Sequence, residues 1–350
     1  MIAIRRTAAL LMLVAAPCTV LTAQDTTVRA DQGVRVGIQY TPGVRPGLVV
    51  LPARGLDSAR AIIARDLDYS DRFEVTVLPA GPVAEPPARG ARAAEPNLAL
   101  YAKLGAALAL ELTPVEGGVR ARLFDVAANR LRNDQTFAVP AVGAPGWRMA
   151  LHRVSDEVVR WGTGTPGIAA TRLLFLAGGR VWRVDSDGAD LAPVTPEGQQ
   201  AMSPTWAPDG TRIAYTVLAN GRGSILVRNL ATGATVQVPS TGSGLNFAAA
   251  FAPDGRTLAF ARADESGTDL YTANVAEQCC VQRLTVGKFA DNLSPTFSPD
   301  GRRIAYISTR AGPPQVYVMD ADGTDQELLA PFDFGVTGGS FAPEWSPDGA

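Results

Sequence analysis

The chain has 350 residues, of which 46% are hydrophobic and 19% charged, and its formal net charge at neutral pH is −2. A chain of this length can bury two hydrophobic cores, so its length predicts two domains. The 32 basic and 34 acidic residues nearly cancel and no basic cluster occurs. This balance excludes binding to nucleic acid or to an anionic membrane by bulk electrostatics.

The amino terminus has the layout of a secretory signal peptide. The basic pair Arg5 and Arg6 precedes an apolar run over residues 8–16, and the small residue Ala23 follows. The apolar run is too short to span a bilayer, so we expect residues 1–23 to be cleaved from an exported chain.

Two other targeting signals fit less well. The residues around the arginine pair do not extend a twin-arginine motif. Pro17 before Cys18 differs from the small residue that a lipid-anchor site needs. We therefore favour general secretion.

Residues 24–163 carry no repeat, and their patterns mix strands with helices. The order strand, helix, strand at their start indicates an α/β domain. Asp57 or Ser58 is the expected cap of the first helix. A proline-rich stretch over 79–96 indicates an exposed loop, and a linker over 162–167 ends the domain. The predicted strands are 47–52, 73–78, 107–113, 119–125 and 136–139, and the predicted helices are 56–67, 98–104 and 146–161.

A four-residue motif occurs four times within residues 164–350. It reads Ala-Pro-Asp-Gly at 207–210 and 252–255, and Ser-Pro-Asp-Gly at 298–301 and 346–349. The aspartates are 45, 46 and 48 residues apart, which is a period typical of propeller blades. Proline, aspartate and glycine in these positions suit a type I turn, so we expect each copy to form a hairpin corner.

Alternating strands after each of the first three copies of the motif complete a four-stranded blade. Second strands are predicted at 211–217, 257–261 and 303–308, third strands at 224–228, 269–275 and 314–319, and fourth strands at 282–285 and 326–329. Upstream, 171–176, 180–184 and 192–195 indicate the second, third and fourth strands of one more blade. The expected fold class is an α/β domain followed by an all-β propeller with about four blades.

The first blade lacks its first strand, and a strand from the other terminus often closes such a ring. Residues 340–345 are a candidate for this strand and would give a sealed four-bladed ring. The alternative is a larger ring of which the chain holds a part, because the motif at 346–349 leads into a strand that does not follow. We favour the second interpretation, since propellers commonly have more than four blades.

The chemistry-bearing residues favour structural roles. His152 is the single histidine and no Gly-x-Ser-x-Gly elbow occurs, so we expect no catalytic residue, no cofactor and no metal site. The aspartate clusters at 185–190 and 320–325 lack the full pattern of a calcium loop and are interpreted as turns. The aromatic residues before each motif are expected to pack between blades: Trp206, Phe251, Phe297 and Trp345.

The remaining cysteines, Cys279 and Cys280, are adjacent. This spacing does not suit a zinc site and closes no useful loop. We interpret the pair as small residues at a blade turn, with a vicinal disulfide in an oxidising compartment as the alternative.

Together these features resemble the TolB family of the periplasmic Tol-Pal system. The resemblance covers the mature chain and rests on the signal peptide, the α/β domain, the helix segment 152–158, the joint at 164–168 and the Pro-Asp-Gly blades. It implies a non-enzymatic periplasmic scaffold that supports outer-membrane integrity and cell division. It also implies two partners, a Pal-like lipoprotein bound by the propeller and a TolA-like inner-membrane protein bound by the amino-terminal segment.

The resemblance further implies contact residues. The TolA-like segment corresponds to Val34, Arg35, Val36, Gly37 and Ile38, preceded here by an additional stretch over 24–33. Such an extended segment suits addition to the sheet edge of a partner. On the loops over 242–250 and 291–294, Leu245 and Leu293 replace a histidine and a threonine that the family often has. The Pal-like contact residues carried over are therefore Asn246, Ala248, Asn292 and Ser294.

Two other functions stay open from the sequence. Prolyl-oligopeptidase-like enzymes have gating propellers with similar turns, and that function would require a catalytic domain outside these residues. A propeller that binds cell wall or carbohydrate is the second alternative.

Overall fold

The computed structural model describes residues 45–79, 96–240, 244–287, 289–329 and 339–349. Contacts divide the chain into two units, Met1–Gln39 with Ala350 and Tyr40–Gly349, and every described residue belongs to the second unit. The predicted signal peptide and the predicted segment Val34–Ile38 lie outside the described residues. Among the described residues, no helix has the length and apolar content that crossing a membrane requires.

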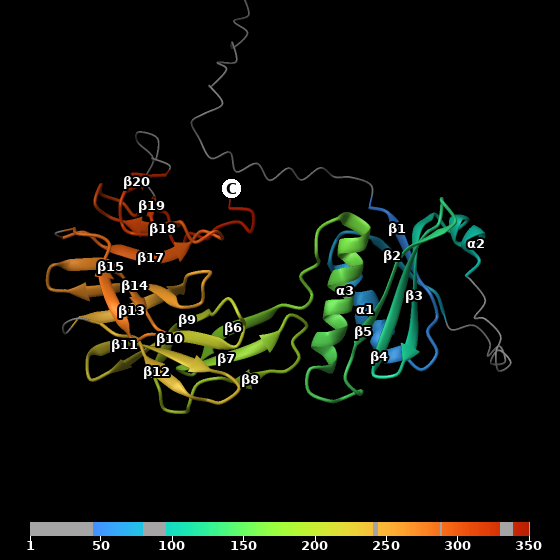
Figure 1. The fold of residues 1–350 in the computed structure, drawn as a ribbon, viewed down its shortest axis with the longest axis horizontal. Helices are drawn as coiled ribbons and strands as arrows, with labels where there is room; N and C mark the ends of the chain where they lie inside the picture. The colour runs from blue at the N-terminus through green and yellow to red at the C-terminus, as the bar shows by residue number, and fades with distance from the viewer. Residues whose placement is uncertain (1–44, 80–95, 241–243, 288, 330–338, 350) are drawn as a thin grey trace, which may run out of the picture. The chain divides into compact units, whose positions relative to one another are not determined.

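The first part of the described chain is a five-stranded mixed sheet with helices on both faces (Figure 1). A βαβ unit begins it, formed by β1 (Gly47–Val50), α1 (Asp57–Tyr69) and β2 (Glu74–Val77). The strand order is β2-β1-β3-β4-β5, in which β3 runs parallel to β1 and the last three strands form antiparallel pairs. These last strands are β3 (Ala106–Val115), β4 (Gly118–Asp125) and β5 (Arg130–Ala138).

The alternation of β1 places apolar side chains on both faces of this sheet. Leu48 and Val50 pack in the core that α1 and α3 (Trp147–Thr163) cover. Val49 points to the opposite face, where it packs with Leu98 of the short helix α2 (Leu98–Ala102). Burial on both faces explains why this strand is a continuous apolar run.

The second part consists of antiparallel sheets that follow one another along the chain. The first sheet has three strands, and each of the next three has four. The sheets are β6 (Arg172–Ala177), β7 (Arg180–Asp185) and β8 (Ala192–Pro193); β9 (Ala201–Trp206), β10 (Arg212–Ala219), β11 (Arg222–Asn229) and β12 (Thr235–Gln237); β13 (Leu245–Phe251), β14 (Thr257–Asp264), β15 (Gly267–Asn274) and β16 (Cys279–Arg283); and β17 (Asn292–Phe297), β18 (Arg303–Ser308), β19 (Gln315–Asp320) and β20 (Glu327–Leu328). This arrangement confirms the predicted fold class and the first blade without its first strand.

All four copies of the motif form the predicted turn, and the first three copies make the hairpin corner between the first two strands of the second, third and fourth blades. In the second blade, Gly210 has a φ of 65° and its N–H donates to Ala207 O at 2.9 Å. Gly255, Gly301 and Gly349 make the same bond at 2.8–2.9 Å with φ values of 64°, 73° and 75°. The Asp209 carboxylate accepts from the Thr211 N–H at 2.8 Å, which closes the turn from the other side.

Apolar side chains join successive sheets, as the constant position of the aromatic residues predicts. One cluster joins the second and third sheets and contains Phe251, and the next joins the third and fourth sheets with Phe297 packed against it. Trp206 packs against a third cluster, which joins the first and second sheets. Because each sheet contacts mainly its neighbours, the blades stabilise one another in series.

One prediction about local structure is wrong, and the candidate closing strand of the interpretation that we did not favour is absent. The cap of α1 is Leu56, and neither Asp57 nor Ser58 caps it with a side-chain hydrogen bond, because the helix already begins at Asp57. Residues 340–345 form no strand. Their polar groups instead contact the preceding blade, where the Ser340 N–H donates to Pro314 O at 2.9 Å and Trp345 Nε1 donates to Thr296 O at 3.1 Å.

Candidate functional site

The four residues expected to contact a Pal-like partner lie near the start of β13 and β17. These are the first strands of the third and fourth blades, and we refer to the first strand of a blade as its inner strand. Asn246 and Asn292 are buried, with exposed fractions of 6% and 1%. Asn246 Nδ2 donates to Gly223 O at 3.2 Å, and Asn292 Nδ2 donates to Thr268 O at 3.0 Å. Each acceptor belongs to the third strand of the preceding blade. The two asparagines therefore join the start of β13 and of β17 to the blade before it.

The other two residues, Ala248 and Ser294, are half-buried and each has a φ of 51°. The pairing of β13 with β14 and of β17 with β18 shifts register at these positions, which marks a β-bulge. Ser203 and Ala342, with φ values of 46° and 48°, hold the same place in the neighbouring copies of the motif. Each of the four residues lies six positions before the aspartate of its motif, so this backbone conformation recurs with the motif along the chain.

Sequence patterns gave no signal for these bulges. A positive φ is most common at glycine and asparagine, and none of the four residues is of either type. The two leucines that depart from the family pattern, Leu245 and Leu293, are half-buried. A Cβ at Gly223 would lie 2.5 Å from Leu245 Cδ1, which shows how closely this leucine packs on the preceding blade.

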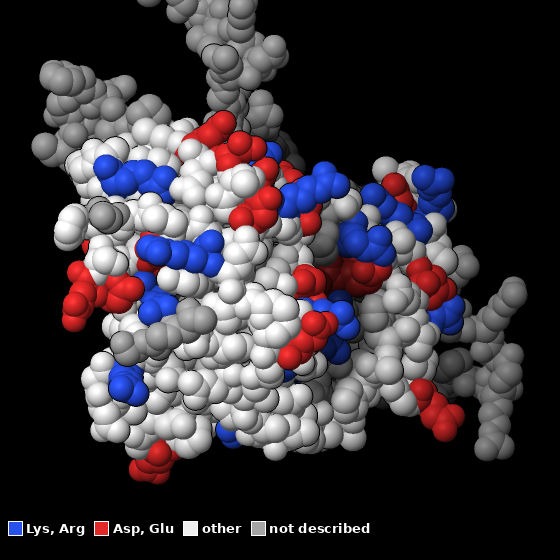
Figure 2. Space-filling model, turned by 60° about the vertical axis from the view of Figure 1, so that its left-hand side comes forward, with Lys and Arg blue, Asp and Glu red and all other residues white. Residues whose placement is uncertain are grey.

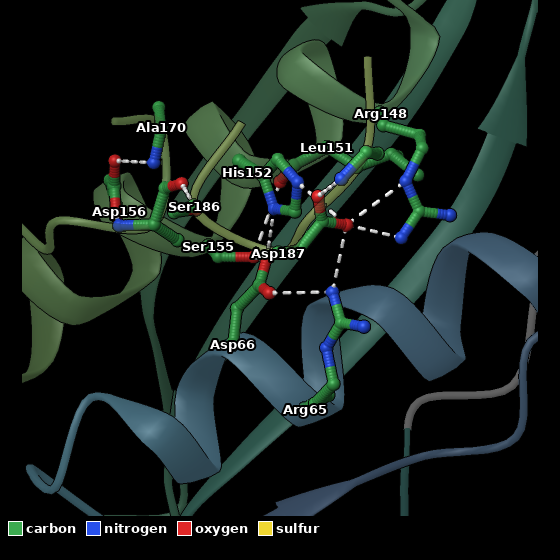
Figure 3. Close-up of polar contacts among 12 residues, drawn as sticks. Arg65, Asp66, Arg148, Leu151, His152, Ser155, Asp156, Ala170, Ser186 and Asp187 are labelled. Atoms are coloured by element: carbon green, nitrogen blue, oxygen red, sulfur yellow. Dashed lines mark hydrogen bonds and ion pairs between the residues drawn. The ribbon is translucent and has the colours of Figure 1, made fainter. Parts of the chain in front are cut away.

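A second group of polar residues gathers around His152 of α3 (Figure 3). His152 is fully buried, and its Nδ1 lies 2.7 Å from Asp66 Oδ2 of α1. Its Nε2 lies 3.3 Å from Asp187 Oδ2, in the turn between β7 and β8. Ser155 Oγ donates to the same Asp66 oxygen at 2.8 Å. We refer to this group as the His152 cluster, and its members are Arg65, Asp66, Arg148, His152, Ser155 and Asp187.

Asp187 joins the two helices to the first blade. Its carboxylate accepts from Arg65 Nη2 at 3.1 Å and from Arg148 Nε at 3.0 Å. Within the turn it also accepts from the Ala189 N–H at 3.0 Å. Burial alone would raise the pKa of Asp187, but the hydrogen bonds from Arg148, Ala189 and Arg65 outweigh it and hold that pKa well below its ordinary value.

The same cluster controls the charge of the imidazole. Burial lowers the pKa of His152, but the hydrogen bond to Asp66 and the charges of Asp66 and Asp187 outweigh it. The pKa of His152 therefore lies above its ordinary value of 6.5. A carboxylate lies beside each nitrogen of the imidazole. The imidazolium form suits this arrangement, because both of its nitrogens carry a proton that faces a carboxylate.

Asp156 of α3 holds the segment that leads into the first blade. Its carboxylate oxygens accept from the Ala169 N–H at 2.6 Å and from the Ala170 N–H at 2.8 Å. A Cβ at Gly167 would lie 2.4 Å from Asp156 Oδ1, so the close approach depends on that glycine. Burial raises the pKa of Asp156, although both backbone hydrogen bonds oppose this rise.

The geometry of the His152 cluster favours a structural role over catalysis. Ser155 Oγ directs its hydrogen bonds to Asp66 and to Leu151 O, at 2.8 and 3.2 Å, and not to an imidazole nitrogen. Over the described part of the chain, no serine is therefore activated by this histidine. A pocket of 380 Å³ lies beside the cluster and is lined in part by Tyr69, Ser155 and Ser186.

The sequence patterns identified the elements of this cluster but not the cluster itself. The turn interpretation of 185–190 is confirmed, because the Asp185 N–H donates to Ala189 O at 2.9 Å. The second role of Asp187 was missed, since its partners Arg65 and Arg148 are 122 and 39 residues away. The alternative left open for the cysteine pair is present, as a disulfide joins Cys279 to Cys280.

The comparisons with known proteins agree on one family. The family model described as the TolB beta propeller domain matches residues 162–350. The Protein TolB homolog of Chlorobium chlorochromatii is 33% identical over 167 residues, which are 47% of this chain and 37% of that protein. The Tol-Pal system protein TolB of Bordetella pertussis is 32% identical over 182 residues, which are 51% of this chain and 41% of that protein.

The matched part of the chain thus spans about two fifths of the length of these curated relatives. A crystal structure of TolB from Acinetobacter baumannii shows the same fold, with a TM-score of 0.68 and 24% sequence identity. That match covers 82% of this chain and 72% of the other. Because the propeller model covers more than half of the sequence, this chain belongs to the TolB beta-propeller family.

Proposed function

We propose that the chain is a non-enzymatic, periplasmic protein-interaction scaffold of the Tol-Pal system. In this role its propeller binds a Pal-like lipoprotein and its amino-terminal segment binds a TolA-like protein, and the two contacts together support outer-membrane integrity and cell division. The proposal draws on membership of the TolB family and on relatives named as Tol-Pal system proteins.

One observation supports binding through the propeller in particular. Ala248 and Ser294 occupy the same bulge in consecutive blades and are partly exposed. The neighbouring Asn246 and Asn292 are buried and fix each loop to the preceding blade. We therefore assign direct contact with a Pal-like partner to Ala248 and Ser294, and positioning of the loops to Asn246 and Asn292. Preformed loops bind with a smaller loss of conformational entropy than loops that must order on binding.

The amino-terminal part of the proposal concerns residues outside the described range. We propose that residues 1–23 direct export, that Val34–Ile38 pair with a sheet edge of a TolA-like partner, and that residues 24–163 and 164–350 act as two domains. The helix α3 ends at Thr163 and the family match begins at residue 162, which supports this boundary.

Calorimetric titration tests the binding of a Pal-like lipoprotein. The full chain is titrated with the soluble domain of such a lipoprotein, and saturable binding is expected. Ser294→Arg should weaken it by at least about tenfold, or 1.4 kcal/mol, because a long charged side chain would enter the contact. Thr211→Arg, at an exposed position beside a hairpin corner at the other end of the inner strands, is the matched control. A folded chain that shows no heat of binding at high micromolar concentration would refute the proposal.

A deletion tests the second partner separately. Removing residues 24–38 should abolish binding of a TolA-like domain while leaving the Pal-like interaction unchanged. If the shortened chain binds the TolA-like domain as tightly as the parent does, the assignment of Val34–Ile38 is wrong.

A further inference from the structure

The hairpin that leads into β16 has a backbone fixed by its own side chains. Asn274 Oδ1 accepts from the N–H groups of Ala276 and Glu277 at 3.0 and 2.9 Å, and Gln278 Nε2 donates to Val275 O at 2.8 Å. Gln278 and Cys280 have φ values of 55° and 62°, in the left-handed region that most side chains avoid. Two such residues within three positions hold the turn in one specific shape.

The two cysteines of this hairpin stand at a bulge. Asn274 pairs with Cys279, and the register of β15 with β16 shifts between Thr272 and Asn274. A bulge changes the alternation of side chains along a strand, so adjacent residues need not point to opposite faces. The disulfide between Cys279 and Cys280 shows that their sulfur atoms meet.

A disulfide between neighbours contributes little to the stability of the fold. The stabilisation that a disulfide gives by restricting the unfolded chain becomes smaller as the loop it closes becomes shorter, and here the sequence separation is one residue. Cys280 is also exposed and Cys279 is half-buried, so a reductant can reach the bond. An accessible disulfide that contributes little to stability is more typical of a redox-active cysteine pair than of a structural cross-link.

A carboxylate completes the group. Glu277 Oε2 lies 3.8 Å from Cys279 Sγ, and Glu277 is exposed. One ligand atom from each of Glu277, Cys279 and Cys280 lies within 4.8 Å of the others while the disulfide is intact. The three groups are therefore near enough for one metal ion to reach them once the sulfur–sulfur bond is broken. The adjacent cysteines lack the spacing of a structural zinc site. Two thiolates and one carboxylate with a fourth position for water are instead the donor set of an open site, which a tetrahedral divalent ion accepts.

We propose that Glu277, Cys279 and Cys280 form a redox-gated site for a thiophilic divalent metal ion. In the oxidised state the disulfide withholds both sulfur ligands. A two-electron reductant breaks the sulfur–sulfur bond and leaves two thiols; with a phosphine, a water molecule supplies their two protons and its oxygen leaves as the phosphine oxide. The metal ion then displaces the thiol protons and binds the two thiolates with the Glu277 carboxylate.

Cadmium titration of the full chain tests this site. All variants carry Cys18→Ser, because Cys18 is the third cysteine of the sequence. The phosphine-reduced chain is expected to bind one equivalent of Cd²⁺, seen as a thiolate-to-cadmium charge-transfer band in the ultraviolet. The oxidised chain should show no such band. Binding should also release protons to the solution and weaken as the pH falls.

Variants separate the three ligands. Cys279→Ser and Cys280→Ser should each remove most of the charge-transfer band, and Glu277→Gln should weaken binding by about tenfold or more. Glu265→Gln is the matched control, because Glu265 is exposed in another hairpin of the same blade. The proposal is overturned if the reduced, folded chain binds no Cd²⁺ at one equivalent. It is equally overturned if the chain lacking both Cys279 and Cys280 binds the ion as tightly as the parent.

Discussion

At the residue scale, Asp187 and Asp322 occupy the same position in two hairpin turns. Asp187 accepts from the Ala189 N–H and Asp322 from the Thr324 N–H, both at 3.0 Å. Asp322 is exposed, whereas the Asp187 side chain is 5% exposed and lies between Arg65, Arg148 and His152. Two similar local sequences therefore make a simple turn in one blade and an attachment point for α1 and α3 in the other.

This pair allows a controlled test. Asp187→Asn should lower the free energy of unfolding by about 2 kcal/mol, because two partly exposed arginines and a buried histidine lose their counter-charge. Asp322→Asn should change it by less than about 0.5 kcal/mol. Urea unfolding followed by circular dichroism measures both. Equal effects of the two substitutions would contradict the role given to the His152 cluster.

The charge of His152 can be read directly, since it is the single histidine of the sequence. Its pKa is raised, so the stability it contributes is fully present below its unfolded pKa near 6.5 and is lost as the pH rises through the folded value. The pKa of Asp187 is lowered, so its contribution is lost only as the pH falls below 3.8 toward its folded pKa. The cluster is therefore most stabilising between about pH 4 and pH 6.5.

A proton NMR titration of the imidazole Cε1–H signal measures this shift. The midpoint is expected above 6.5 in the parent chain and lower in Asp66→Asn, because the amide removes a charge beside Nδ1. A midpoint below 6.5 in the parent would show that burial prevails over the two carboxylates.

At the scale of the element, β13 and β17 are each joined to the preceding blade by a buried asparagine amide. The Asn292 side chain donates to Thr268 O, and this bond links the fourth sheet to the third. The same side chain accepts from Arg310 Nη2 at 3.1 Å. Figure 2 shows basic and acidic side chains interspersed on the face it presents. The formal net charge of the whole chain is only −2, so long-range attraction is not expected to dominate the recognition of a partner.

Removing this amide should loosen the blades. Asn292→Ala leaves the Thr268 carbonyl without its buried donor, so it should cost about 2 kcal/mol of unfolding free energy. Gln237→Ala, which removes an exposed amide from the outer strand β12, should change stability by less than about 0.5 kcal/mol. If both variants unfold at the same urea concentration, Asn292 does not join the blades as described.

The sequence predicted those elements whose signal is local. Each hairpin corner is set by adjacent residues such as Pro208, Asp209 and Gly210, and the flanking strands follow from alternation of apolar residues. The bulges at Ala248 and Ser294 could not be predicted, because register between strands and not residue type imposes their backbone conformation. The His152 cluster was equally hidden, since Asp66 and His152 are 86 residues apart.

At the scale of the whole molecule, the family match covers the repeated blades, and the fold match extends over the α/β domain as well. Under the proposed function, the segments over 244–250 and 291–296, which include the start of β13 and of β17, form the surface for a Pal-like lipoprotein. The hairpin corners at 207–210 and 252–255 follow the ends of the first strands β9 and β13, so they serve as an internal reference.

Backbone hydrogen exchange, measured by mass spectrometry with and without the soluble domain of a Pal-like lipoprotein, tests this claim most directly. The claim predicts slower exchange on binding at residues 244–250 and 291–296 and unchanged exchange at 207–210 and 252–255. Protection confined to the hairpin corners or to α1 and α3, or no protection anywhere at saturating lipoprotein, would contradict it.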